Sequence, residues 1–305
     1  MNHAPLDCLI IGAGPAGLTA ALYLGRYRRR VAVVDAGHSR AALIPATHNY
    51  PGFPQGVGGA ELLARLHRQI LPYDVPVRGG NVNELTRDAL FTARFGDERV
   101  SATTVLLATG TEDRQSELAT PDTLRAGTLA GCIRWCPICD GYEGRDQQLG
   151  LLATSPSALD HALFLRTYTS RLTLMLPAGE TPLAQADLAR LQAAGIRMPI
   201  AAPMRIELTV ADRVAVHFAD GTQAPFDALY PMLGSTAQSS LATGLGARCD
   251  AKGELLVDEH QRTSVPGLYA AGDIVKALNQ MTVGMAHAAV AATAIHHSLP
   301  TLWPA

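Results

Sequence analysis

A glycine-rich turn between two apolar runs constrains the fold of this chain more than any other stretch. Residues 6–11 form a nearly continuous apolar run, and the hexapeptide GAGPAG follows at once at 12–17. A helical pattern then covers 18–28, and a second apolar run at 31–34 ends in Asp35. This order of strand, glycine turn, helix and strand predicts a β-α-β unit with buried parallel strands.

The spacing of the glycines in this turn predicts a dinucleotide site. Gly12 would make the tight turn, Gly14 would let the backbone approach a pyrophosphate, and Gly17 would let helix and strand pack closely. The N–H groups at the start of the helix favour phosphate. An acidic side chain about 20 residues further on, here Asp35, suits the ribose hydroxyls. The alternative is a glycine-rich packing turn with a surface aspartate.

A second unit of the same kind occupies the middle of the chain, with strands expected at 149–153 and 172–176 and a helix at 158–167. Its turn reads ATSPSA at 153–158, so side chains stand where glycines would admit a pyrophosphate, and Pro156 lacks an N–H. No arginine follows the second strand to hold a 2′-phosphate. We expect a degenerate nicotinamide turn; the alternative is a divergent turn that still binds a nicotinamide weakly.

A Cys-x-x-Cys pair precedes this second unit, at Cys136 and Cys139, and Asp140 follows it directly. Two sulfurs at this spacing can close a small disulfide ring, and a helix start favours the thiolate of a reactive cysteine. Asp140 could exchange protons with a departing thiolate. The pair would also suit half a zinc site or two structural cysteines. Cys132 is a candidate third ligand or spare resolving thiol, but no second Cys-x-x-Cys or His-x-x-x-His follows.

The composition excludes several classes of protein. The chain has 305 residues, enough for about two domains, and is 48% hydrophobic and 17% charged. Its net charge of −2 argues against nucleic-acid binding and against a polybasic membrane surface. Five cysteines in this length do not make a disulfide scaffold, and without a signal peptide we expect a cytoplasmic protein. No stretch approaches the ~20 apolar residues needed to span a bilayer.

Several stretches between these motifs are expected to be irregular or short. HNYPGF at 48–53 is typical of an extended loop, and residues 121–131 are typical of a turn- and glycine-rich connection. Residues 214–233 are expected to hold two strands and a return connection. Val82 would present exposed backbone to an adenine.

The C-terminal part adds a strand and a helix. The apolar stretch at 268–271 runs into Gly272 and Asp273, and Asp273 suits either a ribityl hydroxyl or the cap of the following helix. Residues 279–281 open a helical pattern whose first N–H groups could face a flavin pyrimidine ring. Trp303 in the tail is a candidate cover for a flavin face, or an ordinary surface tryptophan.

The motifs GAGPAG, HNYPGF, ATG, CPICDG, SVPGLYAAGDI and NQM occur in an order and spacing that resemble the low-molecular-weight thioredoxin reductases from end to end. The resemblance implies an α/β fold of two Rossmann-like, three-layer domains. We expect a discontinuous FAD domain at 1–112 and 238–305, around a central redox domain at 113–237. The resemblance also implies a homodimer, and hinges are expected near Thr111 and at 235–240.

The same resemblance assigns roles to residues. Cys136 and Cys139 would be the redox pair, with Cys139 facing the flavin and Cys136 exchanging with a partner, and Asp140 would be the acid. No metal is expected. The residues expected to bind FAD are Gly12, Gly14, Pro15, Ala16, Gly17, Asp35, His48, Asn49, Val82, Ala108, Thr109, Gly110, Gly272, Asp273, Gln280 and Met281.

The departures from the family pattern concern the nicotinamide. Ordinary members carry a glycine-rich turn and an arginine-containing stretch in the central domain, and both are missing here. We therefore expect a branch that does not use NADPH. Its donor would be ferredoxin or another carrier, and its partner a thioredoxin-like protein or a small disulfide.

Two alternative functions remain open at this stage. Dithiol oxidases of the gliotoxin and holomycin type share the fold and form a disulfide in a small molecule with oxygen. They typically carry a histidine after the second cysteine, where this chain has Asp140, so His48, His287 or the pair His296-His297 would have to supply a base. The other alternative is a non-enzymatic flavin redox sensor.

Overall fold

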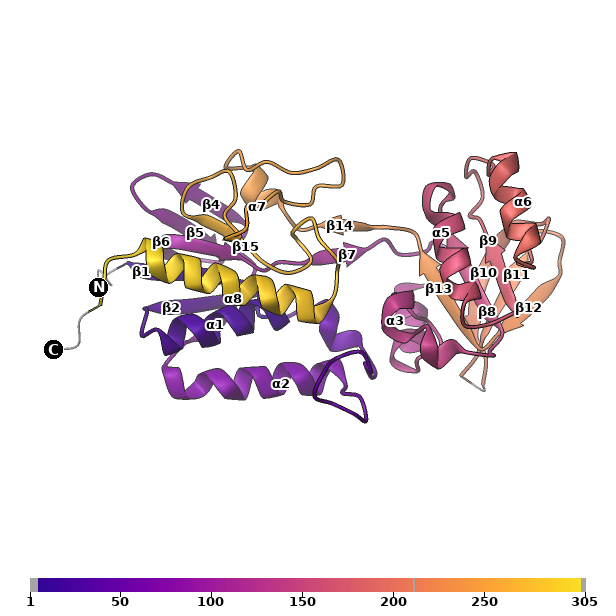
Figure 1. The fold of residues 1–305 in the computed structure, drawn as a ribbon, viewed down its shortest axis with the longest axis horizontal. Helices are drawn as coiled ribbons and strands as arrows, with labels where there is room; N and C mark the ends of the chain where they lie inside the picture. The colour runs from indigo at the N-terminus through magenta and orange to yellow at the C-terminus, as the bar shows by residue number, and fades with distance from the viewer. Residues whose placement is uncertain (1–4, 211, 303–305) are drawn as a thin grey trace. The chain divides into compact units, whose positions relative to one another are not determined.

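The computed structural model describes residues 5–210 and 212–302, apart from the side chain of Pro156 (Figure 1). None of the helices in these ranges combines the length and apolarity that crossing a membrane requires.

The chain divides into two compact units. Unit 1 combines the residues up to 42 with 59–112 and the residues from 236 on, and unit 2 combines 43–58 with 113–235. Unit 1 is therefore discontinuous in sequence. The segment 43–58, expected in the first part of the FAD domain, groups with unit 2 instead.

A parallel sheet forms the centre of unit 1. In order of pairing, its strands are β3 (Val77–Gly79), β2 (Val31–Asp35), β1 (Leu6–Ile11), β6 (Glu98–Leu107) and β15 (Leu268–Ala270). The chain builds outward from β1 first to one side and then to the other. Open parallel sheets bind their ligands at the carboxyl ends of the strands beside such a reversal. The expected first β-α-β unit and the α/β fold are confirmed.

An antiparallel hairpin widens the same sheet. β4 (Glu84–Arg87) pairs with β5 (Phe91–Phe95), and β5 pairs with the first half of β6, while β15 pairs with its second half. The ten-residue strand β6 therefore pairs with β5 and β15 along the same edge. In the described residues this sheet has seven strands.

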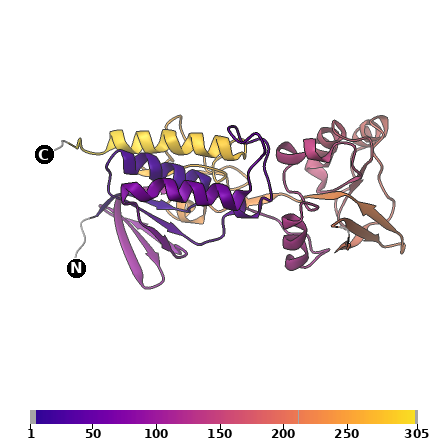
Figure 2. The ribbon, with the colours of Figure 1, turned by 90° about the horizontal axis from the view of Figure 1, so that it is seen from below.

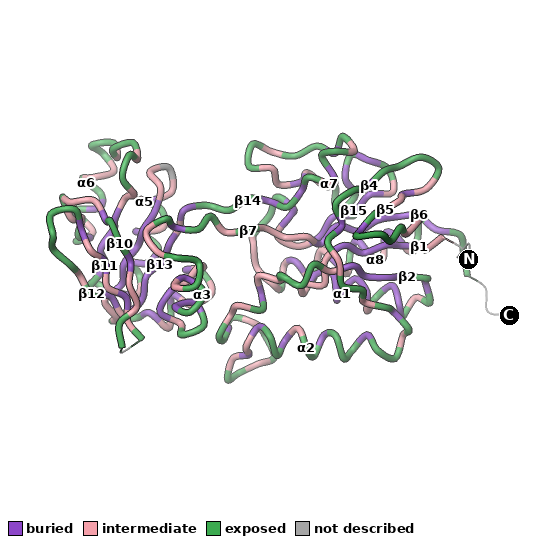
Figure 3. Tube along the Cα trace, turned by 180° about the vertical axis from the view of Figure 1, so that it is seen from behind, coloured by how far each residue is buried: buried purple, intermediate pink, exposed green. Residues whose placement is uncertain are grey.

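Three helices lie side by side along unit 1: α1 (Pro15–Arg26), α2 (Gly59–Ile70) and α8 (Met281–Ser298), with α1 packed against both others (Figure 2). α1 begins before the expected residue 18 because Pro15 is pre-organised for the first helical position. α2 buries Leu62, Leu66 and Ile70, one residue per turn, and leaves its other face exposed (Figure 3). The short helices are η1 (Arg40–Leu43), η2 (Leu71–Tyr73) and α7 (Ser240–Thr243).

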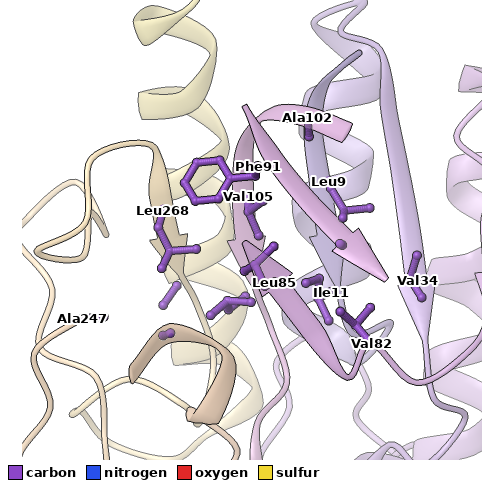
Figure 4. Close-up of a cluster of buried hydrophobic side chains, with 14 of the residues drawn as sticks. Leu9, Ile11, Val34, Val82, Leu85, Phe91, Ala102, Val105, Ala247 and Leu268 are labelled. Carbon is purple, nitrogen blue, oxygen red and sulfur yellow. The ribbon is translucent and has the colours of Figure 1, made fainter. Parts of the chain in front are cut away.

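One hydrophobic core cluster of unit 1 lies between the sheet and the segments that follow β3 and β14. Leu9, Ile11 and Val34 from the parallel strands meet Phe91 and Val82 there (Figure 4). Val82 is only 7% exposed, and its side chain packs in this core.

Unit 2 contains the second β-α-β unit. β8 (Leu149–Ala153) lies between β9 (Leu172–Met175) and β13 (Ala228–Met232), and all three strands are parallel. α5 (Ser155–Arg166) follows β8, and α6 (Gln185–Ala193) follows β9. The strands agree with the expected bounds to within one residue, whereas α5 begins three residues earlier than expected.

A small antiparallel sheet accompanies it, made of β10 (Pro203–Leu208), β11 (Val214–Phe218) and β12 (Gln223–Phe226). Residues 214–233 therefore hold three strands, including β13, and not two. At the crossings between the units, β7 (Thr111–Asp113) pairs with β14 (Ser235–Ala237).

The expected turn-rich stretch at 121–131 is wrong, because α3 (Pro121–Leu129) occupies it. Thr120 caps this helix by accepting a hydrogen bond from the Thr123 N–H at 3.2 Å, and Pro121 takes the first helical position. Gly127 suggested a turn, but a Cβ there would lie 2.6 Å from Ile133 Cδ1. The glycine therefore serves close packing and not chain reversal.

Candidate active site

The carboxyl ends of the parallel strands in unit 1 gather most of the residues expected to bind a dinucleotide. Gly12 follows β1, Asp35 ends β2, Ala108 follows β6 and Gly272 comes soon after β15. The topology therefore brings together residues from both ends of the chain.

Gly12 and Gly17 of the first turn lie so close to neighbouring backbone atoms that only glycine fits. A Cβ on Gly12, whose φ is +104°, would lie 2.4 Å from Ala108 O, and a Cβ on Gly17 would lie 1.8 Å from Gly12 O. No side chain fits at either position. A Cβ on Gly14 would meet nothing nearer than Ser39 Oγ at 3.5 Å, so the backbone of Gly14 is open to approach.

At the start of α1, no side chain of the N-cap or of the first turn accepts the first N–H groups of the helix. Gly14 is the N-cap and makes no side-chain cap, Pro15 follows, and the first turn contains no acidic residue. Asp35 lies beside this turn, where its carboxylate accepts the Ala13 N–H at 2.8 Å and the Gly37 N–H at 3.0 Å. An uncapped helix start of this kind is an anion site.

The second chain end forms another side of the same turn. Gly272 has a φ of +85°, and a Cβ there would lie 3.1 Å from the Ala16 Cβ. The next residue, Asp273, forms an ion pair with Arg40, the Oδ2 to Nη1 distance being 3.5 Å. Arg40 is a candidate for holding an anionic ligand that the sequence analysis missed.

The ATG stretch is tied to the residue that follows β14. Thr109 Oγ1 donates to Gln238 O at 2.7 Å, and the Gln238 N–H donates to Gly110 O at 2.9 Å. Gly110 has a φ of +68°, and a Cβ there would meet nothing within 4 Å. This stretch therefore leaves backbone open beside β6.

Polar atoms at the start of α8 are buried without a partner. Gln280 is the N-cap and Met281 the first helical residue. Among the described residues, Asn279 Oδ1 and His287 Nδ1 are buried side-chain atoms that make no hydrogen bond. Burial lowers the pKa of His287, opposed by the charge of Asp273, so this imidazole favours its neutral form. Orphaned polar atoms of this kind suit a polar ligand.

In unit 2, Cys136 and Cys139 form a disulfide, with their Cα atoms 5.3 Å apart. The short helix α4 (Pro137–Asp140) holds them, Cys136 being its N-cap and Pro137 its first residue, and η3 (Tyr142–Gly144) follows. The Cys139 N–H donates to Cys136 O at 2.9 Å. Bonded sulfurs are not thiolate ligands, and in 5–210 and 212–302 no three His, Cys, Asp or Glu side chains are grouped to hold a metal ion.

Asp140 is held by two residues that the sequence analysis did not assign. Tyr230 Oη donates to Asp140 Oδ1 at 2.9 Å, and Arg134 Nη1 donates to Asp140 O at 3.3 Å. Burial raises the pKa of the Asp140 carboxyl to about 6, although the Tyr230 hydrogen bond and the Arg134 charge act to lower it. A carboxyl with this pKa can hold and release a proton near neutral pH.

The HNYPGF loop lies on the redox segment of unit 2. His48 Nδ1 is 3.4 Å from Glu143 Oε1, and Asn49 Nδ2 donates to Ile138 O at 3.4 Å. Both residues were expected to line FAD. They contact residues beside the disulfide, and Asn49 Oδ1 also accepts a hydrogen bond from Thr47 Oγ1 at 2.8 Å.

The start of α5 differs from that of α1, because a carboxylate closes it. Glu180, which follows β9, accepts the Ser155 N–H with Oε2 at 2.9 Å, and the Ser155 hydroxyl donates to Thr181 O. Thr154 is the N-cap residue and makes no side-chain cap. A negative side chain therefore occupies the place where a β-α-β turn receives phosphate.

Three further candidate residues, Cys132, His296 and His297, lie in the described part of the chain. Cys132 is a buried free thiol whose pKa is raised by burial, and His296 Nδ1 accepts a hydrogen bond from Arg29 Nε at 3.0 Å. His297 lines an open surface groove of unit 1. Trp303 lies outside the described residues.

Comparisons with known proteins agree with this site. The sequence pattern of the family described as "Pyridine nucleotide-disulphide oxidoreductase" matches residues 6–293. The chain is 27% identical to the thioredoxin reductase of Treponema pallidum, over 97% of this chain and 98% of that protein. It is 30% identical to the ferredoxin–NADP reductase of Granulibacter bethesdensis, over 95% and 88%.

Among solved structures, HlmI is similar with a TM-score of 0.88 and 29% identity, covering 97% of this chain and 93% of that chain. Fold, disulfide and sequence pattern agree. The chain therefore belongs to the pyridine nucleotide-disulphide oxidoreductase family and is a thioredoxin reductase-like oxidoreductase.

Proposed function

We propose that the protein is an FAD-dependent thiol–disulfide oxidoreductase that relays electrons between the flavin and the Cys136–Cys139 pair without an NADPH site. The observation that carries this proposal is the contrast between the two β-α-β turns. The turn at α1 is open to a pyrophosphate, whereas Glu180 closes the turn at α5.

The residues of unit 1 fit FAD. Gly14 leaves its backbone open to the pyrophosphate at the start of α1, and Asp35 is placed for the adenosine ribose. Asp273 and Arg40, which pair with each other, would hold a ribityl hydroxyl and a phosphate. The unpartnered Asn279 Oδ1 would find a donor in the cofactor. When bound, FAD supplies a reversible two-electron couple.

The chain's own residues carry the disulfide chemistry of unit 2. Cys139 is the sulfur assigned to the flavin, and Cys136 is the one assigned to the partner, whose disulfide it attacks as a thiolate. Asp140 holds a proton near neutral pH and gives it to the thiolate that leaves. The hinges proposed near Thr111 and at 235–240 would expose the pair.

The class of electron donor is inferred from the start of α5. The Glu180 carboxylate takes the Ser155 N–H that a phosphate would use, and its negative charge would repel a pyrophosphate. No arginine follows β9 for a 2′-phosphate. We therefore assign the donor to ferredoxin or another one-electron or thiol carrier.

The partners are proposed from the relatives. Thioredoxin reductases among them favour a thioredoxin-like protein, or a small disulfide, as the electron acceptor. We propose a homodimer in the cytoplasm, where Cys8, Cys132 and Cys249 would stay reduced.

The relay can be tested without knowing the donor. The holoenzyme flavin is photoreduced under nitrogen, the protein is quenched in acid, and its thiols are alkylated and counted by mass. Three alkylated cysteines are expected before illumination and five after it, because only the Cys136–Cys139 disulfide opens. A count that stays at three while the flavin is reduced would rule out the relay.

A second candidate is oxidation of a small dithiol, with electrons flowing from the disulfide site to the flavin and then to oxygen. The position of His48 beside the redox segment favours it, because an imidazole there could deprotonate a dithiol. Oxygen consumption with a small dithiol, and none with a protein dithiol, would select this function.

A further inference from the structure

We propose that Tyr230 is a positioning residue that orients the Asp140 carboxyl and sets its protonation for thiol–disulfide exchange. The inference deepens the proposed function, since it rests on Asp140 being the proton donor to the leaving thiolate. It concerns a residue on β13, 90 positions away in the sequence from Asp140 of α4.

The geometry places Tyr230 as a fixed support. The residue lies in the middle of β13, is fully buried, and pairs with Leu151 of β8. Its hydroxyl donates to Asp140 Oδ1 at 2.9 Å. Because the ring is packed in the core, the hydroxyl cannot move away without disturbing the sheet.

Arg134 links this support to the start of the redox segment. Its Nη1 lies 3.4 Å from Tyr230 Oη and 3.3 Å from Asp140 O, and its Nε donates to Gly131 O at 2.9 Å. The Arg134 N–H also donates to Leu229 O, which ties the segment to β13. The Tyr230 hydroxyl therefore donates to the carboxylate while facing a cation.

The charged and titratable groups that act on Asp140 come from three elements. Tyr230 on β13 and Arg134 before α4 favour its carboxylate form, and Glu143 of η3 disfavours it. Glu143 is in turn paired with His48 of the preceding loop. Burial outweighs the favourable contacts, so removing the Tyr230 hydroxyl would raise the pKa of Asp140 further.

Tyr230 supports the reduction of the Cys136–Cys139 disulfide by a dithiol. A thiolate of dithiothreitol attacks one sulfur of the Cys136–Cys139 disulfide, the S–S bond breaks, and the other sulfur leaves as a thiolate that takes the Asp140 proton. The second dithiothreitol thiolate then displaces the remaining cysteine. The protein disulfide is reduced to two thiols, and dithiothreitol is oxidised to its cyclic disulfide.

The test compares Tyr230→Phe with the wild-type holoenzyme and with Tyr142→Phe, a control that removes an exposed hydroxyl near the pair. Disulfide reduction by dithiothreitol is followed from pH 4.5 to 8.5 by alkylation and mass. Each rate is divided by the dithiothreitol thiolate concentration. For the wild type, the corrected rate should fall as pH rises through about 6, as Asp140 loses its proton.

In Tyr230→Phe this fall should move to higher pH by about one unit, and the low-pH plateau should drop because the carboxyl is no longer oriented. Infrared titration of the carboxyl, assigned with Asp140→Asn, should show the same shift without any turnover. Tyr142→Phe should leave both curves unchanged.

Dithiothreitol bypasses the flavin and its donor, so the outcomes separate two failures. If Asp140→Asn slows reduction but Tyr230→Phe leaves the midpoint and the infrared titration unchanged, the assignment of Tyr230 is wrong and the proton donor stands. If Asp140→Asn changes nothing, Asp140 is not the proton donor, and the proposed function loses that step together with the role of Tyr230.

Discussion

The two β-α-β units of this chain share an architecture and differ at one helix start. In unit 1, α1 begins at Pro15 after the N-cap Gly14, without a side-chain cap and without an acidic residue in its first turn, and the Asp35 carboxylate takes only the Ala13 N–H that precedes the helix. In unit 2, α5 begins at Ser155, whose N–H is taken by the Glu180 carboxylate. A helix start binds whichever anion reaches it, and in unit 2 the chain supplies that anion itself.

The difference indicates that the same fold can form whether or not its turn is open to a dinucleotide. Both turns follow a buried parallel strand and lead into a twelve-residue helix, so the same packing supports both. The two turns differ in two ways. Gly14 leaves its backbone open in unit 1, and in unit 2 the carboxylate of Glu180, which follows β9, takes the Ser155 N–H. Unit 2 has the scaffold of a dinucleotide domain and carries the Cys136–Cys139 disulfide, and we propose that it binds no nicotinamide.

The largest expected effect tests whether unit 2 works through sulfur. Cys136→Ser should lower reduction of a protein disulfide by about a thousandfold or more, because the thiolate that attacks the partner is gone. Flavin content should not change. Cys249→Ser, at an exposed free cysteine, is the matched control in a steady-state assay with photoreduced enzyme. A Cys136→Ser variant that still reduces the partner would show that unit 2 does not act through this cysteine.

A second variant transplants the closed turn onto the open one. The Ser39 hydroxyl is 3.5 Å from the position of a Cβ on Gly14, so Ser39→Glu would bring a carboxylate to the start of α1 as Glu180 does at α5. The Kd for FAD, measured by flavin fluorescence, should rise about 10- to 100-fold through charge repulsion. Ser39→Gln adds similar bulk without charge and should rise much less. Equal losses in the two variants would mean that bulk, not charge, decides.

The buried carboxyl of unit 2 should make its stability depend on pH. The pKa of Asp140 rises from 3.8 unfolded to about 6 folded, so the folded state disfavours ionisation, and this penalty grows as pH rises between those values. Asp140→Asn removes it. The variant should come close to the wild type near pH 4 and exceed it by about 3 kcal/mol well above pH 6, measured by urea unfolding of the oxidised protein. A constant difference at all pH values would contradict the burial of this group.

The smallest expected effect concerns the carboxylate that closes the α5 turn. Glu180→Gln removes the charge at the helix start and should lower the stability of unit 2 by about 0.5 to 1 kcal/mol, seen as a small drop in melting temperature. Glu117→Gln, at an exposed position of the same unit, should have no effect. Inorganic pyrophosphate should raise the melting temperature of Glu180→Gln more than that of the wild type. Identical melting curves for Glu180→Gln and the wild type would show that the Glu180 charge does not stabilise the start of α5.

The sequence predicts the parts of this molecule that depend on local pattern. The run at 6–11 becomes β1 because it is apolar except for Asp7, and 149–153 becomes β8 because it is apolar throughout. The spacing of Cys136 and Cys139 allowed a disulfide but also a zinc site, and the resemblance of the whole chain favoured the disulfide that the structure shows. Local pattern failed at 121–131, where Gly127 suggested a turn but serves packing against Ile133.

The contacts that tune the site could not be predicted in this way. Glu180 reaches Ser155 across 25 positions, and Tyr230 reaches Asp140 across 90. Neither residue lies in a recognisable motif, because only the pairing of parallel strands brings it to its partner. The grouping of 43–58 with unit 2 is likewise a property of tertiary contacts.

The most direct measurement of the central claim is anaerobic. The oxidised holoenzyme is mixed in turn with NADPH, NADH and reduced ferredoxin, and the visible absorbance of the flavin is followed. We expect no rapid bleaching with either nicotinamide, because Glu180 holds the α5 turn closed. Bleaching is expected with a donor that needs no dinucleotide site. Rapid bleaching by NADPH would show that unit 2 accepts a nicotinamide, and would contradict the account.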